Sequence, residues 1–138
     1  MNHTQQSLIE QLKKEAEEGN ADSMFEYAQI LRDGRGVIIK KKEASIYFKK
    51  AADLGDEKSM RVYSEMLSKG EGIKVDMNES VKYLKKSADA GNVRSMLEYA
   101  QMREEGNTIA VDEFESAKYC KKAADQGDVF GQFNYGSK

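Results

Sequence analysis

The chain of 138 residues repeats itself with a constant spacing of 36 residues. One glycine recurs at the same point of each cycle, as Gly19, Gly55, Gly91 and Gly127. All seven tyrosines keep the same period, in the series Tyr27, Tyr63, Tyr99, Tyr135 and the series Tyr47, Tyr83, Tyr119. Such self-similarity is typical of repeat architectures, in which each short unit buries its apolar face against its neighbours. The sequence therefore predicts a stack of small units and not one globular domain around a single core.

Each unit has the apolar pattern of two helices. Apolar side chains recur at i, i+3, i+4 and i+7, which is the spacing along one face of an α-helix. In the first unit these residues are Met24, Tyr27, Ala28 and Leu31, followed by Ala44, Tyr47, Phe48 and Ala51. We predict a helix A at about 21–33 and a helix B at about 41–54. Between them runs a glycine-containing loop, which Val37 and Ile39 are expected to hold against the helices.

Residues with capping chemistry lie at the predicted helix ends. Gly55 follows helix B, at the position where a left-handed residue commonly ends a helix. Asp56 then stands where the next helix A needs an N-cap. Asp76 and Glu79 have capping-box spacing at the start of the second helix B, and the third unit repeats this pair. Lys40 replaces the aspartate in the first unit, so we expect a less sharp helix start there.

The periodicity divides the chain into five segments. We expect an N-terminal capping helix over 4–18, complete repeats over 19–54, 55–90 and 91–126, and a partial fourth repeat over 127–138 that consists of helix A only. The N-terminal segment has the pattern of a helix B with a polar outer face, as a terminal cap requires. The last segment has no helix B to cover it. We interpret this as truncation of a longer array; the alternative is that this helix caps the stack itself. An uncapped helix at this end also offers a surface for self-association.

Composition excludes several classes of function. Lys and Arg number 22 and Asp and Glu 24, and this net charge of −2 gives no electrostatic case for binding nucleic acid. No apolar run approaches the roughly 18 residues that span a bilayer, which argues against membrane insertion. One Cys and one His make neither a disulfide framework nor a Cys/His zinc site, and we expect no metal and no cofactor. One Cys and no secretory signal pattern favour a cytoplasmic location.

The residues with catalytic potential all have simpler structural explanations. Cys120 occupies the repeat position of Phe48 and Leu84, so we predict a buried packing thiol and not a nucleophile. His3 lies in a terminal segment and cannot form a Cys–His pair. The Gly-x-Gly loops lack the strand-to-helix context of a phosphate-binding loop. The paired lysines at 49–50, 85–86 and 121–122 fit helix C-terminal ends, and an acidic or phosphate-rich ligand is the less favoured interpretation. We predict no catalytic residue.

The repeat has a specific sequence pattern. It reads G-[ND]-x-x-S-M-x-x-Y-[AS]-x-x-L-x-x-G-x-G-[VI], followed by A-x-x-Y-F-K-K-A-A, and it extends over roughly residues 5–138. This pattern resembles the SEL-1-like repeat (SLR), a relative of the tetratricopeptide repeats. Tyr27 replaces the usual Leu of that family, Tyr47 stands where Trp is frequent, and the Pro after the Gly-x-Gly segment is missing. Relatives with a Cys pair in each repeat have a reported penicillin-binding activity, whereas this chain has only Cys120.

The resemblance implies an all-α fold, namely an α/α right-handed superhelical solenoid with helices A along its concave side. It also implies an adaptor that holds protein complexes together, because no catalytic residue belongs to the repeat itself.

The surface of helix A changes between repeats while the core positions stay constant. A helical wheel places positions 22, 25, 29 and 32, and their equivalents 36 and 72 residues later, beside the core stripe. The residues predicted to bind a partner are Phe25, Gln29, Arg32, Arg61, Glu65, Arg94, Leu97, Gln101 and Phe133. The apolar members would serve as anchors and the arginines would meet polar groups. The mixed charge of this groove favours a protein or peptide over nucleic acid.

The sequence thus predicts a non-catalytic protein–protein interaction scaffold that holds its partner in the concave groove of helices A. One alternative is a hydrolase of the kind reported for the Cys-rich relatives, which requires a nucleophile and a base that the sequence does not bring together. The other alternative is a purely structural spacer within a longer repeat array.

Overall fold

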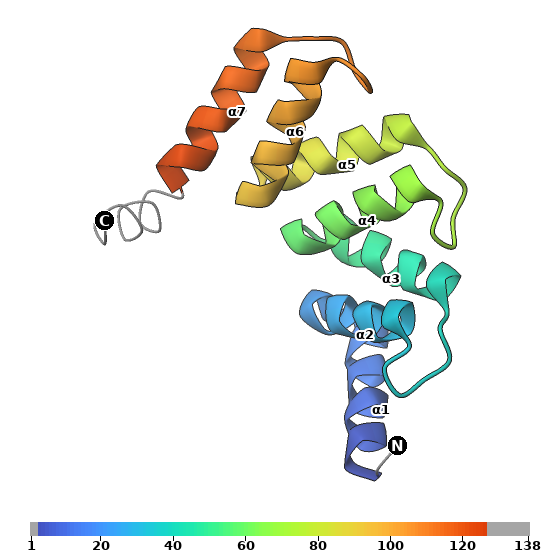
Figure 1. Cartoon of the computed structure of the whole chain (residues 1–138). Coiled ribbons are helices and arrows are strands. Elements are labelled where there is room, and N and C mark those ends of the chain that lie inside the picture. Colours follow the sequence, from blue (N-terminus) through green and yellow to red (C-terminus); the bar gives the residue numbers. More distant parts are fainter. Residues whose placement is uncertain (1–2, 127–138) are drawn as a thin grey trace, which may run out of the picture. The chain divides into compact units, whose positions relative to one another are not determined.

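The structure, a computed structural model, describes residues 3–126 and contains α-helices and no strand in that range (Figure 1). The helices are α1 (His3–Glu17), α2 (Ala21–Asp33), α3 (Lys41–Asp53), α4 (Glu57–Lys69), α5 (Met77–Asp89), α6 (Val93–Glu105) and α7 (Glu113–Gln126). Helices α2, α4 and α6 are the predicted helices A, and α1, α3, α5 and α7 are helices B. The all-α prediction is confirmed. The predicted fourth helix A, at 127–138, lies outside the described residues.

The chain divides into two compact units with a boundary inside α5. The first unit is Met1–Tyr83 and the second is Leu84–Lys138. The first contains α1 to α4 and the beginning of α5, and the second contains the rest of α5 with α6 and α7.

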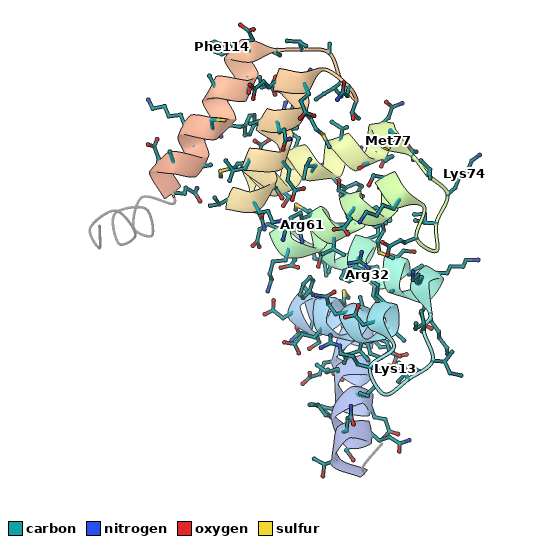
Figure 2. All side chains as sticks on the ribbon, in the orientation of Figure 1. Lys13, Arg32, Arg61, Lys74, Met77 and Phe114 are labelled. Carbon is teal, nitrogen blue, oxygen red and sulfur yellow. The ribbon has the colours of Figure 1, made fainter. Side chains whose placement is uncertain are left out.

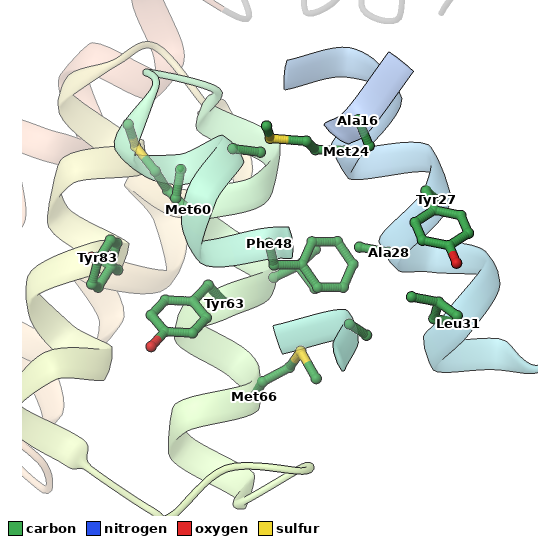
Figure 3. Close-up of a cluster of buried hydrophobic side chains, with 14 of the residues drawn as sticks. Ala16, Met24, Tyr27, Ala28, Leu31, Phe48, Met60, Tyr63, Met66 and Tyr83 are labelled. Carbon is green, nitrogen blue, oxygen red and sulfur yellow. The ribbon is translucent and has the colours of Figure 1, made fainter. Parts of the chain in front are cut away.

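The core of the first unit consists of the predicted apolar positions. Met24, Ala28 and Leu31 of α2 are buried together with Phe48 of α3. Figure 3 shows the Phe48 ring directed at Ala28. Tyr47 is less buried and packs on the surface of this cluster. The 3.6-residue apolar period therefore identified the packing face of both helices correctly.

The predicted caps of helices A and the predicted ends of helices B are present. The side chain of Asp56 accepts a hydrogen bond from the backbone N–H of Ser59 at 3.0 Å, and Asn20 and Asn92 cap α2 and α6 in the same way. At the end of α3, the N–H of Gly55 donates to the carbonyl of Ala52 and that of Asp56 donates to the carbonyl of Ala51. This pair of bonds is the Schellman motif, with Gly55 in the left-handed region at φ +104°.

The capping box predicted for α5 forms only in half. The Asp76 carboxylate accepts a hydrogen bond from the backbone N–H of Glu79 at 3.1 Å. The backbone N–H of Asp76 instead donates to the carbonyl of Leu67 at 3.0 Å, so it is not left for the Glu79 side chain. Lys40 makes no side-chain cap, as predicted. Its backbone N–H makes the equivalent bond to the Leu31 carbonyl, which fixes the start of α3 without a capping side chain.

The loop between helices A and B is held by its branched residues. Val37 is partly buried against the core, as predicted. Ile39 is more than half exposed, yet its Cγ1 would lie only 2.5 Å from a Cβ placed on Gly34. Ile39 thus holds the loop against the end of α2 and not against the helical core.

No helix within residues 3–126 combines the length and the apolar character needed to cross a bilayer.

Candidate protein-binding surface

Phe25, a predicted apolar anchor on α2, packs against its own unit. Its ring meets the Phe48 ring edge-on, with the centroids 5.7 Å apart, and the Lys58 ammonium lies 4.9 Å from the Phe25 centroid. Such edge-to-face and cation–π contacts stabilise packing beyond buried area alone. Phe25 therefore connects α2 with α3 and α4 and presents only part of its ring to solvent.

Arg32, Arg61 and Glu65 belong to one ion-pair cluster in the first unit. The Arg32 guanidinium donates from Nε and Nη2 to the two carboxylate oxygens of Glu71, at 2.9 and 3.0 Å, and Nη2 also reaches Glu65 at 3.1 Å. Arg61 and Lys69 approach the same Glu65 carboxylate at 3.7 and 3.1 Å. The bidentate bond from Arg32 holds the pKa of Glu71 below its usual value. The structure thus gives these predicted binding residues a role in joining α2 to α4 and the following loop.

Gln29 lines a cleft between α1 and α2. The cleft measures about 340 Å³ and is bordered by Leu8, Leu12, Phe25, Gln29 and Ile30. Leu8 is 59% exposed, and the charged residues Glu26 and Arg35 also line this space. Leu8 is not among the residues that the sequence predicts to bind a partner. The first unit therefore places two predicted residues, Phe25 and Gln29, in an open cleft with apolar walls.

In the second unit, Leu97 stands on the outward face of α6. It is 51% exposed. Arg94 and Gln101, which the sequence also predicts to bind a partner, make side-chain contacts within the same helix. Arg94 donates to Glu98 at 3.1 Å and Gln101 donates to Glu105 at 2.8 Å. Leu97 is thus a predicted anchor that the structure leaves open. Phe133, the last predicted residue, lies outside the described part of the chain.

The tyrosines pair within each repeat, and those of α5 and α7 also donate to a carboxylate of the preceding helix B. Tyr63 and Tyr83 meet edge-on with centroids 4.9 Å apart, and the other two repeats have equivalent pairs. The Tyr83 hydroxyl donates to Asp53 at 2.8 Å, and Tyr119 donates to Asp89 at 2.5 Å. Burial, with this bond to Asp53, raises the pKa of Tyr83 to about 12. A constant spacing of 30 residues between Asp and Tyr is the signal that sequence reasoning did not use.

Arg103 makes a polar cluster at the end of α6. Its Nε donates to the Tyr99 hydroxyl oxygen and its Nη1 donates to the Ala110 carbonyl, both at 3.1 Å. The Tyr99 hydroxyl donates to Glu115 at 2.7 Å, and Arg103 and Lys85 pair with the same carboxylate at 3.8 and 3.4 Å. The bond from Tyr99 is the main cause that lowers the pKa of Glu115. Arg103 therefore fills the space between α6, the following loop and α7.

A pocket of about 610 Å³ lies at the corresponding place in the second repeat. Tyr63 and Leu67 of α4 and Ile73 of the following loop form apolar walls, and Asp76 and Glu79 border it at the start of α5. It combines an apolar interior with a carboxylate rim.

The prediction of a buried Cys120 is wrong, because this thiol is exposed on α7. Phe48, at the same repeat position, is covered by the core that α2, α3 and α4 share. The predicted fourth helix A, which follows α7, lies outside the described residues. Within residues 3–126, no three His, Cys, Asp or Glu side chains group in a way that could hold a metal ion.

Pairs of helices A and B with a constant 36-residue period define an α-helical repeat protein of the solenoid class. The family model of the Sel1 repeat matches residues 21–56, 58–92 and 93–128. The chain therefore belongs to the Sel1 repeat family, as the sequence pattern indicated.

Solved structures with the same fold include three bacterial repeat proteins. A protective antigen of uropathogenic Escherichia coli with an SLR fold is 32% identical, with a TM-score of 0.80 over 86% of this chain and 26% of its own. A Sel1 repeat protein from Oxalobacter formigenes is 22% identical, with a TM-score of 0.78 over 86% of this chain and 49% of its own. Cysteine-rich protein B of Helicobacter pylori is 21% identical, with a TM-score of 0.61 over 64% of this chain and 67% of its own. This chain thus spans about a quarter of the first protein and about half of the second. A comparison with curated proteins gives no match.

Proposed function

We propose that this protein is a non-catalytic scaffold that binds a protein or peptide partner through exposed side chains of its helices A and, in the first unit, of the adjacent helix α1. The observation that carries the proposal is the contrast between constant core positions and changing outward positions in successive repeats. Tyr27, Tyr63 and Tyr99 are the same residue and all are buried, whereas positions 25, 61 and 97 hold Phe, Arg and Leu. Sel1 repeat proteins generally act as protein-interaction scaffolds, which supports the same function.

Two surfaces are suited to contact a partner. In the first unit it is the cleft between α1 and α2, where Leu8, Phe25 and Gln29 offer apolar contact beside an amide. In the second unit it is the face of α6 around Leu97, flanked by Arg94 and Gln101. Exposed apolar patches with a polar rim often mark sites of protein–protein interaction. The proposal includes the cytoplasmic location that a single cysteine favours.

The experiment compares proteins captured by the wild-type chain with those captured by Leu8→Asp and Leu97→Asp variants. Both side chains are more than half exposed, so the substitutions leave the core unchanged. Ile38→Asp is the matched control, because Ile38 is an apolar loop residue that is 80% exposed and lies outside both surfaces. We expect Leu8→Asp or Leu97→Asp to lose a captured protein that Ile38→Asp retains, with unchanged thermal unfolding in all three.

Two results would contradict this function. A wild-type chain that captures no protein would favour the structural spacer. Hydrolysis of a β-lactam or peptidoglycan substrate that a single substitution abolishes would favour the enzymatic alternative.

A further inference from the structure

The third repeat shows what the pocket of the second repeat is built to receive. In the third repeat, the guanidinium of Arg103 meets the Tyr99 hydroxyl, the Glu115 carboxylate and the Ala110 carbonyl. The guanidinium carbon also lies 5.6 Å from the centroid of the Tyr99 ring. A phenol, a carboxylate and a backbone carbonyl arranged in this way form a receptor that gives the guanidinium two hydrogen bonds and one ion pair at 3.8 Å, one partner for each of its three nitrogens.

The second repeat carries the same receptor without the arginine. One period of 36 residues before Tyr99, Ala110 and Glu115 lie Tyr63, Lys74 and Glu79, and all three line the pocket of about 610 Å³. The counterpart of Arg103 is Leu67, a buried hydrocarbon side chain that has no hydrogen to donate. The place that the Arg103 guanidinium fills in the third repeat is therefore an open pocket in the second repeat.

Carboxylates lie on one side of this pocket, and the Lys82 ammonium lies 3.8 Å from Glu79 as an exposed ion pair. The carboxylates of Asp76 and Glu79 both border the pocket. Burial raises the pKa of Tyr63; Lys49 opposes this, and the charges of Glu79, Asp53 and Asp76 add to it. Asp76 and Glu79 thus act on the Tyr63 hydroxyl against the opposing charge of Lys49. Lys74 also lines the pocket, and Figure 2 shows its side chain extending from the loop away from the helices.

The walls suit the aliphatic part of an arginine side chain. Leu67 and Ile73 provide an apolar surface inside the pocket, and Met77 stands at its edge with 38% of its surface exposed. Arginine commonly packs its methylene stem along such a surface while its head group pairs with carboxylates. The first repeat offers a weaker match, because Lys40 replaces Asp76 and lies 4.0 Å from the Glu43 carboxylate.

We propose that the pocket formed by Tyr63, Leu67 and Glu79 binds an arginine side chain of a protein partner. The guanidinium takes the place that Arg103 holds in the third repeat, with Glu79 as its carboxylate and the Tyr63 ring beside it. This site rests on the scaffold function proposed above and gives it a defined chemical specificity.

The test is an NMR titration of the full isotope-labelled chain with N-acetyl-arginine amide. Saturable shifts are expected at the amides of Ile73, Val75 and Glu79. N-acetyl-citrulline amide, which has nearly the same shape without the charge, should give no saturation. N-acetyl-lysine amide should bind more weakly, because a compact ammonium cannot direct separate N–H groups at a phenol, a carboxylate and a carbonyl as a planar guanidinium does. Equal binding of the arginine and citrulline compounds would overturn the proposal.

Substitutions locate the site. Glu79→Gln should raise the Kd for the arginine compound by about tenfold or more, because a carboxylate–guanidinium bond is replaced by a neutral one. Glu43→Gln, at the same position in the first repeat, is the matched control and should leave the Kd unchanged. An unchanged Kd for Glu79→Gln would place the compound elsewhere and overturn the proposal.

Two further variants exchange the residues that the second and third repeats hold at positions 67 and 103, and they give a second, independent test. Arg103→Leu empties the receptor of the third repeat and should add a second set of saturable shifts at Tyr99 and Glu115. Leu67→Arg fills the pocket internally and should abolish the shifts at Ile73 and Val75 in a chain that still folds, as judged by its spectrum. If no variant changes the arginine titration while Leu97→Asp still loses its captured protein, the arginine pocket is wrong and the scaffold function stands.

Discussion

Glycine is required at Gly72 for two separate reasons. Its φ of +69° lies in the left-handed region, which strains residues with a Cβ. A Cβ at this position would also collide with the backbone of Lys41 and Lys42, where α3 begins. Gly55 has only the first requirement, because its φ is +104° and no heavy atom would lie within 4 Å of a Cβ placed there. The two glycines therefore separate backbone strain from close approach.

We expect Gly72→Ala to lower the free energy of unfolding by more than Gly55→Ala does. Gly55→Ala should cost about 1–2 kcal/mol, because only the left-handed conformation is strained. Gly72→Ala adds displacement of the α3 backbone, which cannot move as freely as a side-chain end. Urea unfolding followed by circular dichroism measures both. Equal losses would show that the contact with Lys41 and Lys42 is relieved without cost.

Tyr83 makes stability depend on alkaline pH. Its pKa is raised to about 12 in the folded chain, first by burial and then by its hydrogen bond to Asp53, against about 10 when unfolded. The folded state thus favours the neutral phenol. This contribution to stability is fully present below pH about 10 and is lost as the pH rises through about 12.

Tyr83→Phe tests this dependence. At pH about 9 the variant should lose about 1 kcal/mol, because the hydrogen bond to Asp53 is gone while that carboxylate keeps its 2.9 Å contact with Lys49. Between pH about 9 and about 11 its stability should fall less than that of the wild type. The measurement is the urea midpoint of both proteins at each pH. Parallel curves would contradict the link to Tyr83.

At the scale of elements, helices A and B of one repeat meet at small residues. In the second repeat, the Ser64 hydroxyl donates to the Ser80 carbonyl at 2.6 Å and the Ser80 hydroxyl donates to the Ser64 carbonyl at 2.7 Å. In the first repeat the same positions hold Ala28 and Ala44, both fully buried. The shared feature is therefore small size, which lets the two backbones approach, and the serine bonds are an addition in one repeat.

We expect the double change Ser64→Ala and Ser80→Ala to alter the free energy of unfolding by less than about 1 kcal/mol. Removing both partners leaves no unpaired hydroxyl, and the first repeat already packs with two alanines. Ser64→Leu should cost about 1–3 kcal/mol or more, since extra carbons force the helices apart. Thermal unfolding of the two variants decides this. A large loss in the alanine pair would assign stability to the hydrogen bonds instead.

At the scale of the whole molecule, stability is expected to be distributed by unit. In repeat proteins each unit contacts mainly its neighbours, so a local defect weakens nearby segments most. Phe48 is buried in the core of the first unit, and the residues grouped with it lie between Ile9 and Tyr83. The cluster of core residues around Phe48 therefore includes no residue of α6 or α7.

Phe48→Ala should remove roughly 3–5 kcal/mol from the first unit. Hydrogen exchange should accelerate strongly in α2, α3 and α4, and the amides of α6 and α7 should retain most of their protection. Tyr119→Phe, which removes one hydroxyl in the second unit, is the complementary control. Uniform loss of protection from α2 to α7 would show that the two units unfold as one.

Local signals predicted the helices well because they depend on near neighbours in sequence. The apolar stripe of Met24 and Leu31, the N-cap Asp56 and the left-handed Gly55 act within one or two turns, so a linear pattern contains the whole cause. The 36-residue period then established the repeat class, since each unit repeats the same local solution. One bond of the predicted capping box of α5, from the backbone N–H of Asp76 to the Glu79 side chain, does not form. That N–H donates instead to the carbonyl of Leu67 in the preceding helix.

Which residues of the predicted binding surface stay open depends on contacts with residues far away in the sequence, and the sequence did not predict these contacts. The helical wheel places Phe25 and Arg32 beside the core stripe but does not show that Phe48 and Glu71 will occupy their contacts. Cys120 has the repeat position of a core residue, yet its thiol is exposed, so the repeat position alone did not predict its burial.

The sequence by itself determined the all-α repeat architecture, the helix ends and the buried face of each helix, because periodic burial and capping are local and recur with the period. The tertiary structure alone decided which outward side chains remain open. Leu67 and Arg103 occupy the same repeat position, but only packed neighbours show that one leaves a pocket beside Tyr63 while the other fills its equivalent. Side-chain contacts between segments tens of residues apart carry this difference, and such contacts exist only once the helices are packed.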